Sequence, residues 1–500
     1  MTSDAVRIVA ERPTPGTPRP YDFPRVDRTR LSNGLTLAIV DLPGRPLVSA
    51  SLVLRNGAVD EPDADAGATV LAARALTEGT TRYDAVALVE AGERLGAALH
   101  AEAGWDAMSI GIDVPAARLE PAMELLAEVA LEPTFPEAEV DRLRDERLND
   151  LLQAEADPRR RADEVFAATI YSGGSPYRRP SGGTRETVTN LDAGRLRAAW
   201  QRGLDPARTT LVVGGELSGI DVAGIVQRLL GSWGAAYGAN ATGSIVAEGV
   251  VRERFVRVIH RPGSVQTEIR IGHVGLPRRI ADFHSVSVMG AILGGLFNSR
   301  LNTKLREEKG YTYGAGAGFD LRRAAGPFAA RAAVNTEVTV PAIVDTLAEL
   351  DRMRDTPVTA AELKAARDYL VGVFPLRFET PGPVVGALAG LAVHDLPDDE
   401  LIRYRPAIEA VTIESVQAAA QHLRPSESAI VLVGDADAIG GELEAAGFGI
   451  MTIERDRGVQ DEGRASGVQD PLAPLDEGPT GPTAGADEPD ETVDPVPAAD

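Results

Sequence analysis

The fold is decided by two similar stretches, Thr209-Thr210-Leu211-Val212-Val213-Gly214-Gly215 and Ala429-Ile430-Val431-Leu432-Val433-Gly434-Asp435. Each stretch follows a proline-containing turn, at Pro206 or Pro425, and each leads into a helical segment. A short apolar run bounded by turn residues predicts a buried strand. The two copies lie about 220 residues apart, so the sequence predicts a duplicated body.

The beginnings of the two copies are also alike. Leu35–Val40 and Val48–Leu54 are predicted to form one strand pair, and Phe255–Ile259 and Thr267–Ile271 another, with a helix after each pair. This pattern predicts an α+β fold of two homologous lobes, each a mostly antiparallel sheet packed with helices. The predicted boundaries are an N-terminal extension at 1–24, lobe 1 at 25–233, a Gly/Ala/Ser-rich linker at 234–249, lobe 2 at 250–454 and a tail at 455–500.

The charge of the chain excludes several classes of partner. The 500 residues include 51 Lys+Arg and 74 Asp+Glu, a net charge of -23. Such an acidic chain lacks the basic footprint of a nucleic-acid binder or of a protein that docks on anionic lipid. There is no cysteine, which excludes thiolate nucleophiles and cysteine zinc sites. We see no signal peptide and no apolar membrane span, so we expect a cytoplasmic protein.

The C-terminal segment differs in composition from the rest. Residues 455–500 hold three arginines and twelve acidic residues, and proline is frequent. A segment with little apolar content and one sign of charge cannot offset its ordering entropy. We therefore predict a disordered acidic tail there.

Self-contained catalytic motifs are absent from the sequence. No two of the six histidines are spaced like a helical zinc pair, and there is neither a Walker loop nor a Gly-x-Ser-x-Gly elbow. An unconventional metal site made by His260, His273 and His284 is the one arrangement that would let this chain act alone.

One stretch, Gly294 to Tyr313, combines a helix with a predicted strand. Leu301 and Leu305 share a helix face, Gly310 ends the helix, and Tyr313 falls on the adjoining strand. A guanidinium from Arg306 and a phenol from Tyr313 can both donate hydrogen bonds to a developing oxyanion. The alternative is that Arg306 caps its helix and Tyr313 belongs to the core.

Taken together with Gly67–Thr80, these features resemble the pitrilysin/insulinase family of inverted-zincin peptidases over about residues 25–450. Gly67 and the Gly79-Thr80 ending match the frame of that family's zinc helix. The resemblance places His-x-x-Glu-His on that helix, but this chain has Val70, Ala73 and Arg74 there. The family's third ligand falls at Asp150, and we hypothesise an Arg74–Asp150 ion pair in an otherwise degenerate zinc site.

Other landmarks of the family follow in the same order. The resemblance implies that Leu99, His100, Ala101, Glu102 and Ala103 form an edge strand for the peptide substrate. Residues 175–180 and 182–184 resemble the loop after the third-ligand helix. Arg306 and Tyr313 match the family's Arg/Tyr pair, which contacts substrate beside the scissile bond.

The resemblance implies a non-catalytic, substrate-binding subunit of a heteromeric zinc endopeptidase that acts on peptides or unfolded segments. Arg306 and Tyr313 then act in trans. We expect no metal or cofactor in this chain, and zinc in an HxxEH-bearing sibling that pairs with it as a heterodimer or a dimer of heterodimers. The alternative is an inactive homologue that scaffolds a complex or binds peptides without cleavage.

Overall fold

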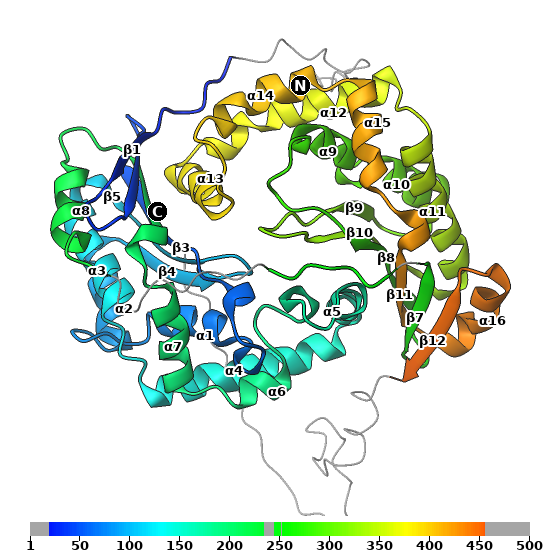
Figure 1. Cartoon of the computed structure of the whole chain (residues 1–500), viewed down its shortest axis with the longest axis horizontal. Helices are drawn as coiled ribbons and strands as arrows, with labels where there is room; N and C mark the ends of the chain where they lie inside the picture. Colours follow the sequence, from blue (N-terminus) through cyan, green and yellow to red (C-terminus); the bar gives the residue numbers. More distant parts are fainter. Residues whose placement is uncertain (1–19, 235–244, 252, 456–500) are drawn as a thin grey trace, which may run out of the picture. The chain divides into compact units, whose positions relative to one another are not determined.

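The computed structural model describes residues 20–234, 245–251 and 253–455. The predicted tail, apart from its first residue, and most of the predicted N-terminal extension and linker lie outside these residues. The described chain contains two six-stranded sheets packed with helices (Figure 1). The predicted α+β architecture of two homologous, mostly antiparallel lobes is confirmed.

The first sheet has the strand order β1-β2-β6-β3-β5-β4, and the second has the order β12-β7-β11-β8-β10-β9. The strands of the first are β1 (Asp27–Arg30), β2 (Thr36–Asp41), β3 (Leu47–Leu54), β4 (Ala98–Ala103), β5 (Met108–Pro115) and β6 (Thr209–Gly215). Those of the second are β7 (Phe255–His260), β8 (Gln266–Val274), β9 (Ala315–Phe319), β10 (Pro327–Asn335), β11 (Ala429–Gly434) and β12 (Ile450–Arg455).

The predicted pairing of the first two strands in each lobe is wrong. β6 lies between β2 and β3, with Leu211 opposite Leu37 in a parallel ladder and opposite Leu52 in an antiparallel one. In the same way, β11 lies between β7 and β8. Both inserted strands are almost wholly buried, which explains their unbroken apolar runs, because a central strand covered on both faces needs no polar alternation.

Each half of the described chain contains eight α-helices. Those of the first half are α1 (Ala68–Ala75), α2 (Ala85–Leu95), α3 (Leu119–Leu131), α4 (Glu137–Ala156), α5 (Pro158–Ile170), α6 (Arg185–Thr189), α7 (Ala193–Gly203) and α8 (Val222–Leu230). Those of the second half are α9 (Phe283–Gly290), α10 (Arg300–Asn302), α11 (Thr339–Asp355), α12 (Ala360–Val373), α13 (Pro381–Val393), α14 (Glu400–Ala410), α15 (Ile413–Ala419) and α16 (Ala436–Ala446).

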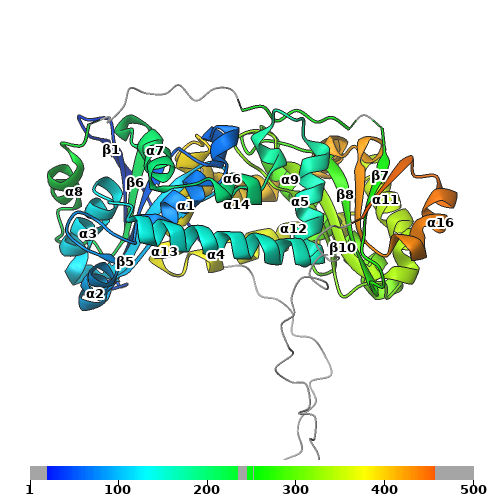
Figure 2. The same cartoon turned by 90° about the horizontal axis from the view of Figure 1, so that it is seen from below.

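In each half of the chain, one helix packs on the sheet of the other half. α5 packs on the second sheet, where a Cβ at Gly272 would lie 3.0 Å from the ring of Phe166. α13 packs on the first sheet, where a Cβ at Gly214 would lie 2.9 Å from a methyl of Val385. Figure 2 shows α4 leading into α5 beside the second sheet. Glycine at both contacts lets the helix from the other half approach the strand closely.

Across the described part of the chain, we find no helix with the length and apolar character needed to cross a membrane.

Candidate functional site

The helix that matches the zinc-helix frame, α1, is anchored at its N-terminus by Glu61. This buried carboxylate accepts hydrogen bonds from the backbone N–H groups of Gly67 at 3.0 Å and Thr69 at 2.6 Å. Burial raises the pKa of Glu61, and the two N–H bonds oppose that effect. Gly67 has φ +95°, and a Cβ there would lie 2.7 Å from the carbonyl oxygen of Gly182. Glycine is therefore required where this helix begins.

The predicted Arg74–Asp150 ion pair is wrong. The Arg74 guanidinium instead lies 2.6 Å from Glu146, one helical turn before Asp150 on α4. Asp150 pairs with Arg147 on its own helix and with Arg160 at 2.9 Å. The hydrogen bond from Arg160 lowers the pKa of Asp150 against a smaller effect of desolvation. Arg160 reaches Asp150 because α5 begins directly after α4.

The residues at the zinc positions do not fit a zinc ion. Val70 and Ala73 offer no ligand atom, and Arg74 brings a positive charge to the place where a cation would bind. Glu146 is already bonded by Arg74 and Arg142, and both lower its pKa. At this position α1 and α4 are therefore linked by an ion pair and not by a shared metal ion.

The predicted edge strand is present as β4. It pairs with β5 alone and ends the first sheet, so one row of its backbone N–H and C=O groups faces away from the sheet. The side chains of β4 alternate between exposed and half-buried positions. His100 lies over Gly111 of β5, where a Cβ would come within 2.3 Å of the ring.

Arg306 and Tyr313 lie on a short segment that is firmly held at its start. α10 and the helical turn Thr303–Glu308 bury Leu301 and Leu305 against the second core. The guanidinium of Arg306 lies 4.5 Å from the centroid of the exposed Phe297 ring, at cation–π distance. Arg306 also forms an ion pair with Glu307 at 3.6 Å, and its side chain remains 36% exposed.

Tyr313 is 93% exposed, so the alternative assignment of this residue to the core is wrong. The prediction that Tyr313 falls on the adjoining strand is also wrong, because β9 begins only at Ala315. Thr312 and Gly314 form a local turn, and Asn302 accepts a hydrogen bond from the Ala315 N–H at 2.8 Å. Among the described residues, no hydrogen bond joins Tyr313 to Arg306.

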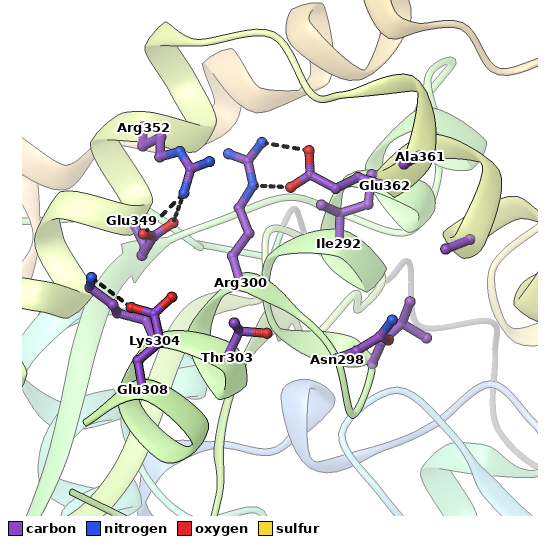
Figure 3. Close-up of a pocket in the computed structure, with 12 residues that line it drawn as sticks. Ile292, Asn298, Arg300, Thr303, Lys304, Glu308, Glu349, Arg352, Ala361 and Glu362 are labelled. Carbon is purple, nitrogen blue, oxygen red and sulfur yellow. Dashed lines mark hydrogen bonds and ion pairs between the residues drawn. The ribbon is translucent and has the colours of Figure 1, made fainter. Parts of the chain in front are cut away.

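A cavity of about 550 Å³ lies behind this segment, and its charges pair with one another (Figure 3). Arg300 makes two bonds to Glu362 of α12, at 2.7 and 3.2 Å, and Lys304 lies 3.0 Å from Glu308. Although burial raises the pKa of Glu362, the bonds from Arg300 and Thr359 lower it to about 2. Sequence reasoning missed this pair, which ties the Arg306 segment to α12.

The three histidines of the unconventional metal site do not converge. His273 packs on Phe328 and accepts a hydrogen bond from the Arg424 N–H, whereas His284 packs between aromatic rings. His260 lies near Asp435 and Asp437, the one candidate group of metal ligands found in the described chain. However, its Nδ1 accepts the Ala436 N–H at 3.0 Å, so this group caps α16.

Residues 175–184 form a buried junction after α5. The ring of Tyr177 packs edge-on against Trp105 at 5.3 Å, and its hydroxyl donates to Asp106 at 3.1 Å. Asp106 also accepts the backbone N–H of Arg323 from the second half. The loop therefore joins the two halves.

Comparisons with known proteins agree with this geometry. The family model described as "Insulinase (Peptidase family M16)" matches residues 36–180, and the one described as "Peptidase M16 inactive domain" matches residues 190–370. The chain is 26% identical to an uncharacterized zinc protease of Mycobacterium tuberculosis, over 82% of this chain and 93% of that protein. It is 23% identical to the Non-peptidase homolog YmxG of Helicobacter pylori, over 67% and 76%.

Solved structures show the same fold. A peptidase M16 inactive domain from Pseudomonas fluorescens superposes with a TM-score of 0.76 and 25% identity, covering 82% of this chain and 98% of that one. A protease from Helicobacter pylori gives a TM-score of 0.76 at 17% identity, with 82% and 100% covered. The chain thus belongs to peptidase family M16, as a homologue with Val70, Ala73 and Arg74 at the positions of the zinc-helix motif.

Proposed function

We propose that this chain is the non-catalytic, substrate-binding subunit of a heteromeric zinc endopeptidase that acts on peptides or unfolded segments. The observation that carries the proposal is the exposure of Tyr313 on a segment whose base is fixed by Arg300, Leu301 and Leu305. An exposed tyrosine contributes little to the stability of its own chain. In this account its phenol and the partly exposed side chain of Arg306 contact another molecule.

The edge strand β4 supplies the second part of the proposal. An extended peptide can add to its free backbone edge by main-chain hydrogen bonds, which read few side chains. Leu99, His100, Ala101, Glu102 and Ala103 are the contact residues in this account. Backbone pairing of this kind suits unfolded segments of varied sequence.

The hydrolytic chemistry belongs to a partner in this account. A sibling chain with the HxxEH motif brings the zinc, in a heterodimer or a dimer of heterodimers. Arg306 and Tyr313 orient the peptide carbonyl and donate hydrogen bonds to the oxyanion that forms in the partner's active site. This chain needs no cofactor of its own for that role.

A second candidate is an inactive homologue that scaffolds a complex or holds peptides without cleavage. The names of two similar proteins, a non-peptidase homolog and an inactive domain, favour it. The two candidates differ in whether Arg306 affects turnover.

The test compares Arg306→Ala with Lys309→Ala in the complex isolated from native cells, using cleavage of an unfolded peptide. Lys309 is an exposed cation of the same segment, so its substitution controls for local charge. Losing an oxyanion donor costs about 2.7–4 kcal/mol, so Arg306→Ala should lower kcat by about 10²–10³. If Arg306→Ala and Lys309→Ala cleave the peptide at the same rate, the result would favour the second candidate, the inactive homologue.

A further inference from the structure

We propose that a second cavity, of about 290 Å³, binds a small anionic ligand that carries a compact apolar body. We call it the arginine pocket. It lies among the end of α4, α5, the loop before α6, and β7. The arginines that line it are Arg161, Arg178, Arg179, Arg185 and Arg257.

Arginine is the most frequent residue in the lining of the arginine pocket. Five arginines and two glutamates line it, and three of the arginines form ion pairs: Arg161 with Glu164, Arg179 with Glu61 and Asp63, and Arg257 with Glu454. In the cavity of Figure 3 all three basic residues lie beside a glutamate, whereas Arg178 and Arg185 of the arginine pocket have no ion pair among the residues that the structure describes. Cations gathered at one concave site focus the field and attract anions.

Several guanidinium groups of this pocket lack a full set of partners. The three side-chain nitrogens of Arg179 are buried without a hydrogen bond, and its ion pairs with Glu61 and Asp63 are long, at 3.6 and 3.7 Å. In the described ranges, Arg178 and Arg185 make no ion pair. A buried donor without an acceptor costs free energy, which a bound oxyanion would recover.

The remaining lining defines the rest of the ligand. Leu151, Val165, Ala168 and Pro180 line the same cavity as the charged groups, and a mixture of apolar and charged lining is typical of small-molecule sites. Arg257 is fixed by two bonds to Glu454, at 2.8 and 3.0 Å, and gives the pocket a rigid side. The planar fork of arginine matches both carboxylate and phosphate oxygens. The ligand class is therefore a carboxylate or phosphate on a short apolar body.

The test uses isothermal titration calorimetry of the full chain at low salt with phenyl phosphate, benzoate and inorganic phosphate. We expect saturable one-to-one binding of phenyl phosphate or benzoate, and the tighter of the two identifies the anionic group. Inorganic phosphate should bind more weakly because it lacks the apolar body. This inference is independent of any partner subunit, so it stands or fails apart from the proposed function.

Variants of the exposed arginines locate the site. In Arg178→Gln/Arg185→Gln, binding should weaken about tenfold or more, because each charge-assisted hydrogen bond contributes about 1.5–3 kcal/mol. Arg118→Gln removes another exposed arginine outside the pocket and should leave binding unchanged. Absence of saturable binding in the wild type, or equal affinity in the double variant, would overturn the proposal.

Discussion

At the scale of single residues, the zinc-helix frame shows what replaces a metal site. Arg74 takes the place of a ligand and pairs with Glu146, so the contact between α1 and α4 is kept by charge. Both side chains are nearly half exposed, and water screens much of their attraction. The pair therefore occupies the position of the family's zinc site but contributes little to the stability of the fold.

That balance predicts a small effect of breaking the pair. Arg74→Ala and Glu146→Ala should each shift the urea midpoint only slightly, and the double variant should be destabilised by about the sum of the two single changes. Urea denaturation measures all three variants. A large shift in either single variant, with little further loss of stability in the double variant, would show instead that the ion pair holds the two helices together.

Tyr313 gives a second prediction at this scale. Tyr313→Phe removes only the hydroxyl of an exposed ring, so the melting temperature should not change. If the phenol donates to the oxyanion, kcat of the complex should fall by about 10²–10³. Tyr369→Phe alters another half-exposed phenol, on α12, and serves as the control. Full activity of Tyr313→Phe would remove this residue from the proposed site.

At the scale of elements, the segment that carries Arg306 depends on its link to α12. Arg300 is only 7% exposed, and its charge is balanced by Glu362. The low pKa of Glu362 means that the folded state holds this carboxylate charged more strongly than the unfolded chain does. Stability from this pair is present above the usual glutamate pKa and is lost as the pH falls toward about 2.

Glu362→Gln therefore has two expected effects. The variant should be less stable at neutral pH, because a buried guanidinium loses its charged partner. It should also lose less stability than the wild type on acidification from pH about 5 toward pH about 3, since the titrating group is gone. Urea unfolding across this range measures both. The same acid dependence in wild type and variant would contradict the assignment.

The elements also show what the sequence can and cannot predict. The apolar runs at Thr209–Gly215 and Ala429–Gly434 predict buried strands, and the structure confirms them. Their insertion between two earlier strands was missed, because pairing over such a sequence separation leaves no local pattern. The partner of Arg74 was missed for a related reason. Glu146 and Asp150 are a single turn apart on α4, and matching the chain to the family's motif positions is not accurate to one helical turn.

At the scale of the whole molecule, the two lobes are joined by the exchange of α5 and α13. Phe166 and its neighbours on α5 belong to the core beneath the second sheet, although they come from the first half of the sequence. Val384, Val385 and Leu388 on α13 do the same beneath the first sheet. Neither sheet is covered on both faces without the other half of the chain.

The exchange predicts that the two halves unfold together. Phe166→Ala should cost about 3–5 kcal/mol, and tryptophan fluorescence and far-UV circular dichroism should report the same shifted midpoint. Trp105, Trp200 and Trp233 all lie in the first half, whereas Phe166 contacts the second sheet. Val265→Ala, at an 81% exposed position, is the control. Separate midpoints for the two probes would show independent lobes.

The central claim is that this chain works with a zinc-bearing sibling, and isolation from native cells tests it most directly. The tagged full chain would be purified under mild conditions and its stoichiometric companions identified by mass spectrometry. The account predicts one companion of similar length that carries HxxEH, and peptide cleavage by the pair. A chain recovered alone, or only with proteins that lack this motif, would contradict it.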